Sequence, residues 1–117
     1  MPFETHGGSP WTRVVPHEIQ LGGEIDLANA KAIGDALCKA LSRGQRPLVV
    51  DLADVTFVDS SAIAMMLHVH RHADALGVTV TWSNLRPEAR RVIRITGVDE
   101  VLLVHNGEPR LPDATSV

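Results

Sequence analysis

The chain has 117 residues, 44% of them hydrophobic and 21% charged, a composition that excludes intrinsic disorder and collagen-like repeats and accommodates one folded domain. Aromatic residues are scarce and the net charge is −3, so a nucleic-acid-binding surface is not expected. The one cysteine cannot form an intramolecular disulfide, and no apolar run approaches the ~20 residues of a membrane helix. The N-terminus lacks the order of a signal peptide, and we therefore expect a cytoplasmic protein without a membrane partner.

The first half of the chain predicts two strands and a helix. Residues 1–10 contain two Gly and two Pro and are expected to be flexible, and short strands follow at 11–15 and 17–21. Gly22 and Gly23 are expected to close the second strand. Apolar residues then recur at spacings of three and four, which predicts an amphipathic helix that ends near Gly44. The residues of this stripe are Leu27, Ala30, Ile33, Leu37 and Leu41.

The middle of the chain predicts a buried strand followed by a second helix. The apolar run at 47–52 is typical of a strand covered by other elements, and 53–61 is expected to be a connection. It ends in Asp59, Ser60 and Ser61, which all favour helix N-termini, so a helix is expected to begin there and to stop at Gly77. Its apolar stripe consists of Ala62, Met66, Val69, Ala73 and Leu76.

The last part of the chain predicts a strand, a helix and a further strand. Residues 78–82 alternate as a short strand does, and Ser83 and Asn84 followed by Pro87 indicate the start of a helix that reaches about Ile95. Residues 101–104 are expected to form the last strand, and 105–117 a flexible tail.

This order of elements predicts an α/β fold, with one domain over residues 11–104 and helices packed against a mixed sheet of four to five strands. Loops that follow parallel strands gather at the carboxyl edge of the sheet. The loops at 22–27 and 55–62 are therefore expected to meet there.

The Asp59-Ser60-Ser61 sequence allows two interpretations. One residue of this kind is enough to cap a helix, so the simplest explanation is a cap and nothing more. The alternative is that a serine hydroxyl at the helix N-terminus is a phosphorylation site, where a phosphate would add about −1.5 to −2 charges and face repulsion from Asp59. Both interpretations remain open at this level.

Three segments resemble the STAS domain of bacterial anti-sigma factor antagonists. They read LGGEID at 21–26, LVVDL at 48–52 and VTFVDSS at 55–61. The region 85–104, with the helix sequence PEARRV, a Thr-Gly pair and a final apolar strand, is also similar to that family. The resemblance covers about residues 11–104 and rests on the order and separation of the motifs, and it implies a single STAS-like domain.

The resemblance implies a switch. In this family the first serine of the Asp-Ser-Ser unit, here Ser60, is phosphorylated by an anti-sigma factor that is a serine kinase. The unmodified antagonist binds that anti-sigma factor and frees the sigma factor, and a protein phosphatase resets the modified form. Asp26 is the family's acidic residue near the serine, and the expected partner surface comprises Asp26, Asp59, Ser61 and Ala62. No cofactor, small-molecule substrate or direct nucleic-acid contact is implied.

The sequence departs from the family pattern at Ala62, where glycine is usual. The additional methyl group favours the helix by about 1 kcal/mol, but it is expected to crowd a partner backbone that approaches the serine. Two alternatives to the switch follow. The domain could be a non-switching STAS subunit docked on a larger assembly such as a lipid-transport ATPase, or a small enzyme with Ser60 as nucleophile. The enzyme is disfavoured because the sequence shows no Gly-x-Ser-x-Gly motif and places no histidine as a base.

The remaining polar residues favour structural roles. His68 and His72 are expected to share an exposed face of the second helix without further metal ligands, and His70 to lie at the core edge. Cys38 is expected to be a small buried hydrophobic residue rather than a reactive thiol. The arginines of the third helix are expected to form a solvated face; these are Arg86, Arg90, Arg91 and Arg94.

Overall fold

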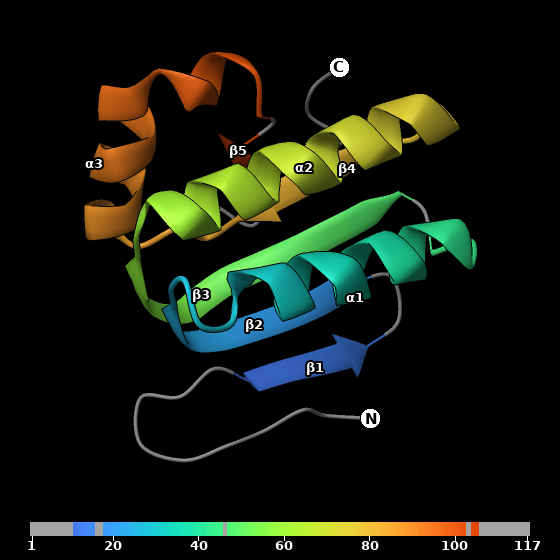
Figure 1. The fold of residues 1–117 in the computed structure, drawn as a ribbon, viewed down its shortest axis with the longest axis horizontal. Coiled ribbons are helices and arrows are strands. Elements are labelled where there is room, and N and C mark those ends of the chain that lie inside the picture. Colours follow the sequence, from blue (N-terminus) through green and yellow to red (C-terminus); the bar gives the residue numbers. More distant parts are fainter. Residues whose placement is uncertain (1–10, 16–17, 46, 103, 106–117) are drawn as a thin grey trace.

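The computed structural model describes residues 11–15, 18–45, 47–102 and 104–105 (Figure 1). The stretches expected to be flexible, 1–10 and 105–117, lie outside these ranges except for His105. The strands are β1 (Trp11–Val15), β2 (Glu18–Ile25), β3 (Leu48–Val58), β4 (Val80–Ser83) and β5 (Val104–His105). The helices are α1 (Ala30–Ser42), α2 (Ser60–Leu76), α3 (Pro87–Thr96) and the short 3-10 helix η1 (Val98–Glu100).

The five strands form one sheet in the order β1-β2-β3-β4-β5. The β1–β2 pair is antiparallel and the other pairs are parallel, as expected where helices connect successive strands. Helices α1 and α2 lie side by side over one face of the sheet, and α3 lies near the end where α2 begins (Figure 1). The α/β class and the mixed sheet predicted from the sequence are therefore confirmed.

Alternation along β3 places the core between the sheet and the two helices. Leu48, Val50 and Leu52 are buried, whereas Asp51 lies on the opposite face because successive side chains point to opposite sides. β3 is longer than predicted, since 53–58 belongs to the strand and not to a connection. The parallel pairing with β2 continues to Ile25 opposite Val58 and buries Val58. Because Asp54 and Thr56 interrupt the apolar run, the sequence did not predict that the strand continues to Val58.

The prediction that Gly22 and Gly23 close β2 is wrong. The strand runs on to Ile25, and its pairing with β3 shifts register on either side of these glycines. Gly23 has φ 86°, a conformation that glycine adopts at low cost, so the pair accommodates an irregularity within the strand. Because the strand continues, Asp26 lies directly after a paired residue at its carboxyl end.

Helix α1 begins three residues later than its apolar stripe predicts. Ala30, Ile33, Leu37 and Leu41 are buried as expected, but Leu27 is 82% exposed. The turn before the helix removes Leu27 from the helical period and points its side chain away from the core. The sequence pattern was therefore correct for the helix and wrong for its first member.

Helix α2 follows its prediction closely. Ala62, Met66, Val69 and Ala73 are buried, and Gly77 ends the helix in the left-handed conformation with φ 71°. Leu76, the last residue of the helix, is 37% exposed and lies outside the core. The periodicity thus placed this helix correctly up to its final turn.

The predicted cap of α3 is wrong. Ser83 belongs to β4, and the side chain of Asn84 donates to Asp51 Oδ1 at 3.0 Å instead of capping the helix. The residue at the N-cap is Arg86, whose Nε donates to the carbonyl oxygen of Ala53 at 2.9 Å and ties the helix start to β3. Pro87 occupies the first turn as expected.

The last strand also begins later than predicted. The backbone N–H groups of Val101 and Leu102 both donate to the carbonyl oxygen of Val98, at 2.9 Å each, and hold this segment as a turn. Strand β5 is therefore Val104–His105 rather than 101–104. Leu102 is buried, while Val101 is 52% exposed.

A carboxyl pair lies on the sheet face opposite α1 and α2. Burial is the main reason that the pKa of Glu18 is raised above its usual 4.5, and the charge of Asp51 and a hydrogen bond to it raise it further. Asp51 Oδ1 also accepts from the Ala53 N–H at 3.0 Å and from Asn84. Because the folded state holds the Glu18 proton more tightly, the free energy of unfolding falls as the pH rises from about 4.5 through the raised pKa.

The variant Glu18→Gln removes the decrease in the free energy of unfolding that accompanies ionisation of Glu18. We expect it to unfold at a higher temperature than the unmodified protein at pH 7 and at the same temperature near pH 4, where both carry a neutral side chain at this position. Thermal unfolding at a series of pH values measures the difference. Glu24→Gln, on an exposed residue of the same strand, is the matched control, and an equal change in both variants would contradict the assignment to Glu18.

Candidate functional site

The carboxyl edge of the sheet brings together the two loops that the sequence singled out. Ile25 pairs with Val58 on neighbouring parallel strands, so Asp26 and Asp59 each follow a paired residue and lie next to one another at the edge. Glu24 pairs with Phe57 one step earlier. The predicted meeting of the loops is thus confirmed, and the edge carries the carboxylates of Glu24, Asp26 and Asp59.

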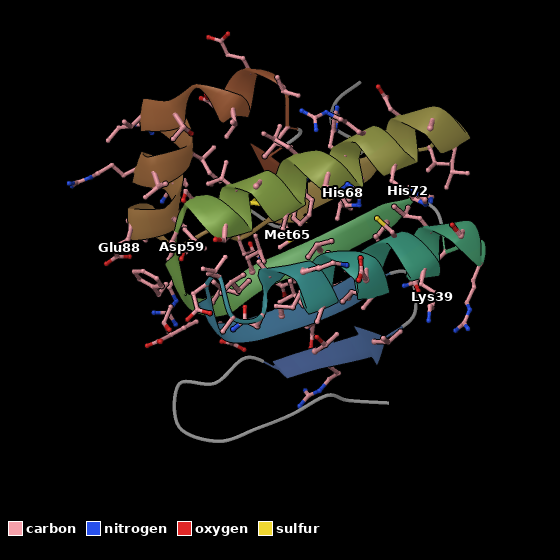
Figure 2. The ribbon with its side chains drawn as sticks, in the orientation of Figure 1. Lys39, Asp59, Met65, His68, His72 and Glu88 are labelled. Atoms are coloured by element: carbon pink, nitrogen blue, oxygen red, sulfur yellow. The ribbon has the colours of Figure 1, made fainter. Side chains whose placement is uncertain are left out.

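Asp59 lies at the start of helix α2 (Figure 2), and its side chain caps the helix. Its backbone is extended, and Oδ1 accepts from the N–H groups of Ser61 at 2.8 Å and Ala62 at 3.2 Å. The backbone oxygen of Asp59 accepts from Ile63 N at 3.2 Å and begins the helical ladder. A side-chain cap of this kind stabilises a helix by about 1 kcal/mol. Neither serine is therefore needed to cap the helix.

The two serines differ in accessibility. Ser60 is the first residue of α2 and is exposed, and within the described part of the chain its hydroxyl makes no hydrogen bond. Ser61 is half-buried and its N–H is held by Asp59. Of the two hydroxyls, that of Ser60 is the one open to a partner.

Ala62 is buried, as its place in the apolar stripe of α2 predicts, and its side chain is not at the surface where a partner contact was expected. Its side chain is 1% exposed and belongs to the core beneath α2. The expectation that its methyl group crowds a partner is contradicted, because the second residue after the exposed Ser60 points toward the sheet. Ala62 contributes helix stability and packing, and its side chain is not accessible from the surface.

Asp26 organises the turn between β2 and α1. Its Oδ1 accepts from the Ala28 N–H at 3.0 Å, and its own N–H donates to Asn29 Oδ1 at 3.0 Å. Asn29 Nδ2 in turn donates to the Glu24 carbonyl oxygen at 2.9 Å. These bonds close a turn that leaves Leu27 exposed at the carboxyl edge. The sequence identified Asp26 but missed Leu27, although an Asp followed three residues later by Asn is a signal for such a turn.

An open groove of about 440 Å³ runs between α1 and α2 from this edge. Met65 and His68 lie on the side of α2 that faces α1 (Figure 2). The groove is lined by Leu27, Ala30, Lys31, Gly34, Asp35, Ser61, Ala64, Met65 and His68. Sequence reasoning did not find this groove, because it depends on how two helices pack.

The three histidines of α2 differ in their exposure to solvent. His72 is half-buried and its Nε2 lies 3.0 Å from Ser42 Oγ, so it links the ends of α2 and α1. His68 is exposed within the groove, and His70 is half-buried at the core edge as predicted. In the described ranges, no three His, Cys, Asp or Glu side chains are arranged to hold a metal ion.

The sequence also singled out Cys38 and the arginines of α3. Cys38 is half-buried, and burial, followed by the charge of Asp35, raises the pKa of its thiol and lowers its reactivity. Arg91 and Arg94 are exposed as predicted, whereas Arg90 is half-buried. None of the helices in the described residues is long and apolar enough to cross a membrane.

The mixed sheet presents an exposed serine at a helix N-terminus beside two aspartates, and comparison with known proteins identifies the family. The family model described as "Mlab, STAS domain" matches residues 12–105. The chain belongs to the STAS domain family.

Several relatives of the chain are named as anti-sigma factor antagonists. The anti-sigma-F factor antagonist RsfA of Mycobacterium tuberculosis is 33% identical over 89 residues, which span 74% of this chain and 70% of that protein. The structure of an anti-sigma factor antagonist from Mycobacterium paratuberculosis superimposes with a TM-score of 0.74 and 26% identity, covering 97% of both chains.

A more distant structural relative is SpoIIAA, which has been solved in an unphosphorylated form and, from Bacillus, in a phosphorylated form. The TM-scores are 0.62 and 0.59 at 17% and 19% identity. The match covers 86% and 82% of this chain and 90% of each SpoIIAA chain. At this identity the likeness shows the shared fold.

Proposed function

We propose that this protein is an anti-sigma factor antagonist that binds a cognate anti-sigma factor of the serine kinase type and so releases a sigma factor. Phosphorylation of Ser60 by that partner ends the binding, and a protein phosphatase restores it. The protein works in the cytoplasm and is the substrate of these enzymes rather than an enzyme itself. Asp26, Asp59 and Ser61 form its partner surface around Ser60.

The observation that carries this proposal is that Asp59 caps the helix while the Ser60 hydroxyl remains exposed. Asp59 satisfies the helix N-terminus, so the exposed Ser60 hydroxyl is available for chemistry without loss of the cap. In the transfer, Ser60 Oγ forms a bond to the γ-phosphorus of ATP held by the kinase, ADP leaves, and the hydroxyl proton is released. The relatives named as antagonists, and SpoIIAA with its two phosphorylation states, support the same role.

The electrostatics of the edge explain how one phosphate would act as a switch. The phosphate adds about −1.5 to −2 charges beside the carboxylates of Asp26 and Asp59. A partner surface that fits the neutral hydroxyl then has to desolvate this charge, which is costly without a matching cation. The positive end of the α2 dipole partly stabilises the phosphate within the free protein. Binding is thereby weakened without refolding.

The test is phosphorylation by the cognate serine-kinase anti-sigma factor in the presence of Mg-ATP, followed by intact mass measurement. We expect one phosphate on the unmodified protein and on Ser61→Ala, and none on Ser60→Ala. Ser61→Ala is the matched control because it removes the neighbouring hydroxyl and keeps the Asp59 cap. A protein that stays unmodified, or that is modified equally in Ser60→Ala, contradicts the switch.

The description of the matched family model, which names Mlab rather than an antagonist, favours a second candidate function. In this case the same edge would hold the domain permanently in a larger assembly such as a lipid-transport ATPase. Stable co-purification with such an ATPase, together with no phosphate on Ser60, supports this alternative and contradicts the first.

A further inference from the structure

We propose that the groove between α1 and α2 receives a large apolar side chain of the anti-sigma factor, and that Leu27 is the apolar anchor on this chain's side of the contact. This inference rests on the proposed function and adds to it the part of the surface that supplies affinity. Ser60 would then lie beside the Leu27 anchor, and a phosphate on Ser60 would weaken binding through its charge.

The exposure of Leu27 is the first observation. A leucine that is 82% exposed gains no stability from folding, yet the Asp26 turn holds it at the mouth of the groove. Burying such a side chain in a complex removes apolar surface from water, which is typical of binding hot spots. Phe57, at the same edge, is also 50% exposed.

The position of the groove is the second observation. Ser61 lines the groove and is the residue next to Ser60. A kinase that transfers phosphate to Ser60 has to cover the first turn of α2, and a specific interface buries about 800 Å² on each partner. An interface of this size centred on Ser60 also covers the mouth of the groove, so the same partner occupies both.

The charge of the groove defines the kind of side chain that fits. Lys31 Nζ and Asp35 Oδ2 lie 3.0 Å apart and neutralise one another, and both side chains are mostly exposed at the rim. Most of the remaining lining is uncharged and apolar, from Leu27, Ala30, Gly34, Ala64 and Met65, while Ser61 and His68 add two polar side chains. An aliphatic or aromatic side chain is therefore favoured over a charged one.

The experiment compares two exposed aliphatic residues. Leu27→Asp is measured against Ile95→Asp, since Ile95 is 75% exposed on α3 and does not line the groove. The readout is the affinity of the unphosphorylated variants for the cognate serine-kinase anti-sigma factor, by calorimetry. We expect Leu27→Asp to weaken binding at least about 30-fold and Ile95→Asp less than about threefold. Ala64→Arg, which fills the groove from an exposed position of α2, is expected to weaken binding at least about tenfold.

The outcomes distinguish a failure of the groove proposal from a failure of the proposed function. If the unmodified protein binds the anti-sigma factor and Leu27→Asp and Ala64→Arg bind equally well, the groove proposal is overturned and the function stands. If the unmodified protein binds no such factor, both are overturned. Equal losses in Leu27→Asp and Ile95→Asp also overturn the groove proposal. Circular dichroism and light scattering verify that each variant is folded and in the same oligomeric state as the unmodified protein.

Discussion

Ser60→Asp is expected to bind the cognate anti-sigma factor at least about tenfold more weakly than the unmodified protein, a loss of about 1.4 kcal/mol. The carboxylate places a fixed charge on an exposed position whose neighbours at the sheet edge, Asp26 and Asp59, are also carboxylates. Docking would desolvate that charge without an opposite charge from this side of the contact. Calorimetry at two salt concentrations measures both the loss and its electrostatic share.

The fold of Ser60→Asp is expected to be unaffected. A negative charge in the first turn of a helix is favourable by about 0.3–1 kcal/mol, which offsets repulsion from Asp59, and the Asp59 cap does not involve the Ser60 side chain. Ser60→Asn, neutral and nearly equal in size, is the control and should retain binding. Tighter binding by Ser60→Asp would show that the partner is basic at this point and would overturn the charge mechanism.

Gly34→Val is expected to destabilise the fold by about 2 kcal/mol, because this glycine sets the distance between α1 and α2. A Cβ at this position would lie 2.9 Å from Met65 Cγ, so the buried Met65 side chain would have to shift. The small gain in helix propensity over glycine does not offset this clash. Urea unfolding measures the change, and Ala36→Val, on an exposed position of the same helix, should cost less than about 0.7 kcal/mol.

A double variant isolates the contact. Met65→Ala by itself leaves a cavity and is expected to cost about 2–5 kcal/mol. In that background Gly34→Val should cost much less, since the valine methyls enter the space that the methionine vacated. Additive losses in the double variant would contradict a direct contact between these two positions.

The spacing of apolar residues predicted the helices well because it depends only on residues that are close together in the chain. The buried residues of α1 and α2 recur with the helical repeat, and Gly77 and Gly97 end α2 and α3 in the left-handed conformation that only glycine adopts easily. The same reasoning failed at Leu27, which has the right spacing but precedes the helix. The hydrogen bonds of the Asp26 turn, not the spacing, decide where α1 begins.

Strand lengths were less predictable because pairing is not local. The sequence at 53–58 does not alternate regularly between apolar and polar residues and was expected to be a connection, yet β2 supplies backbone partners as far as Val58. Asn84 shows the same limitation, since its side chain bonds to Asp51, 33 residues earlier, and not to the helix that follows it. A pattern read along the chain does not include such distant partners.

By itself the sequence determined the order of the elements, the α/β class and the region where function is concentrated, because hydrophobic period and cap residues act over a few neighbouring positions. Tertiary structure decided which of the three residues at 59–61 caps the helix and which one is exposed. It also created the groove beside Leu27. Burial, accessibility and the shape between two helices depend on contacts between distant segments, and these exist only in the folded chain.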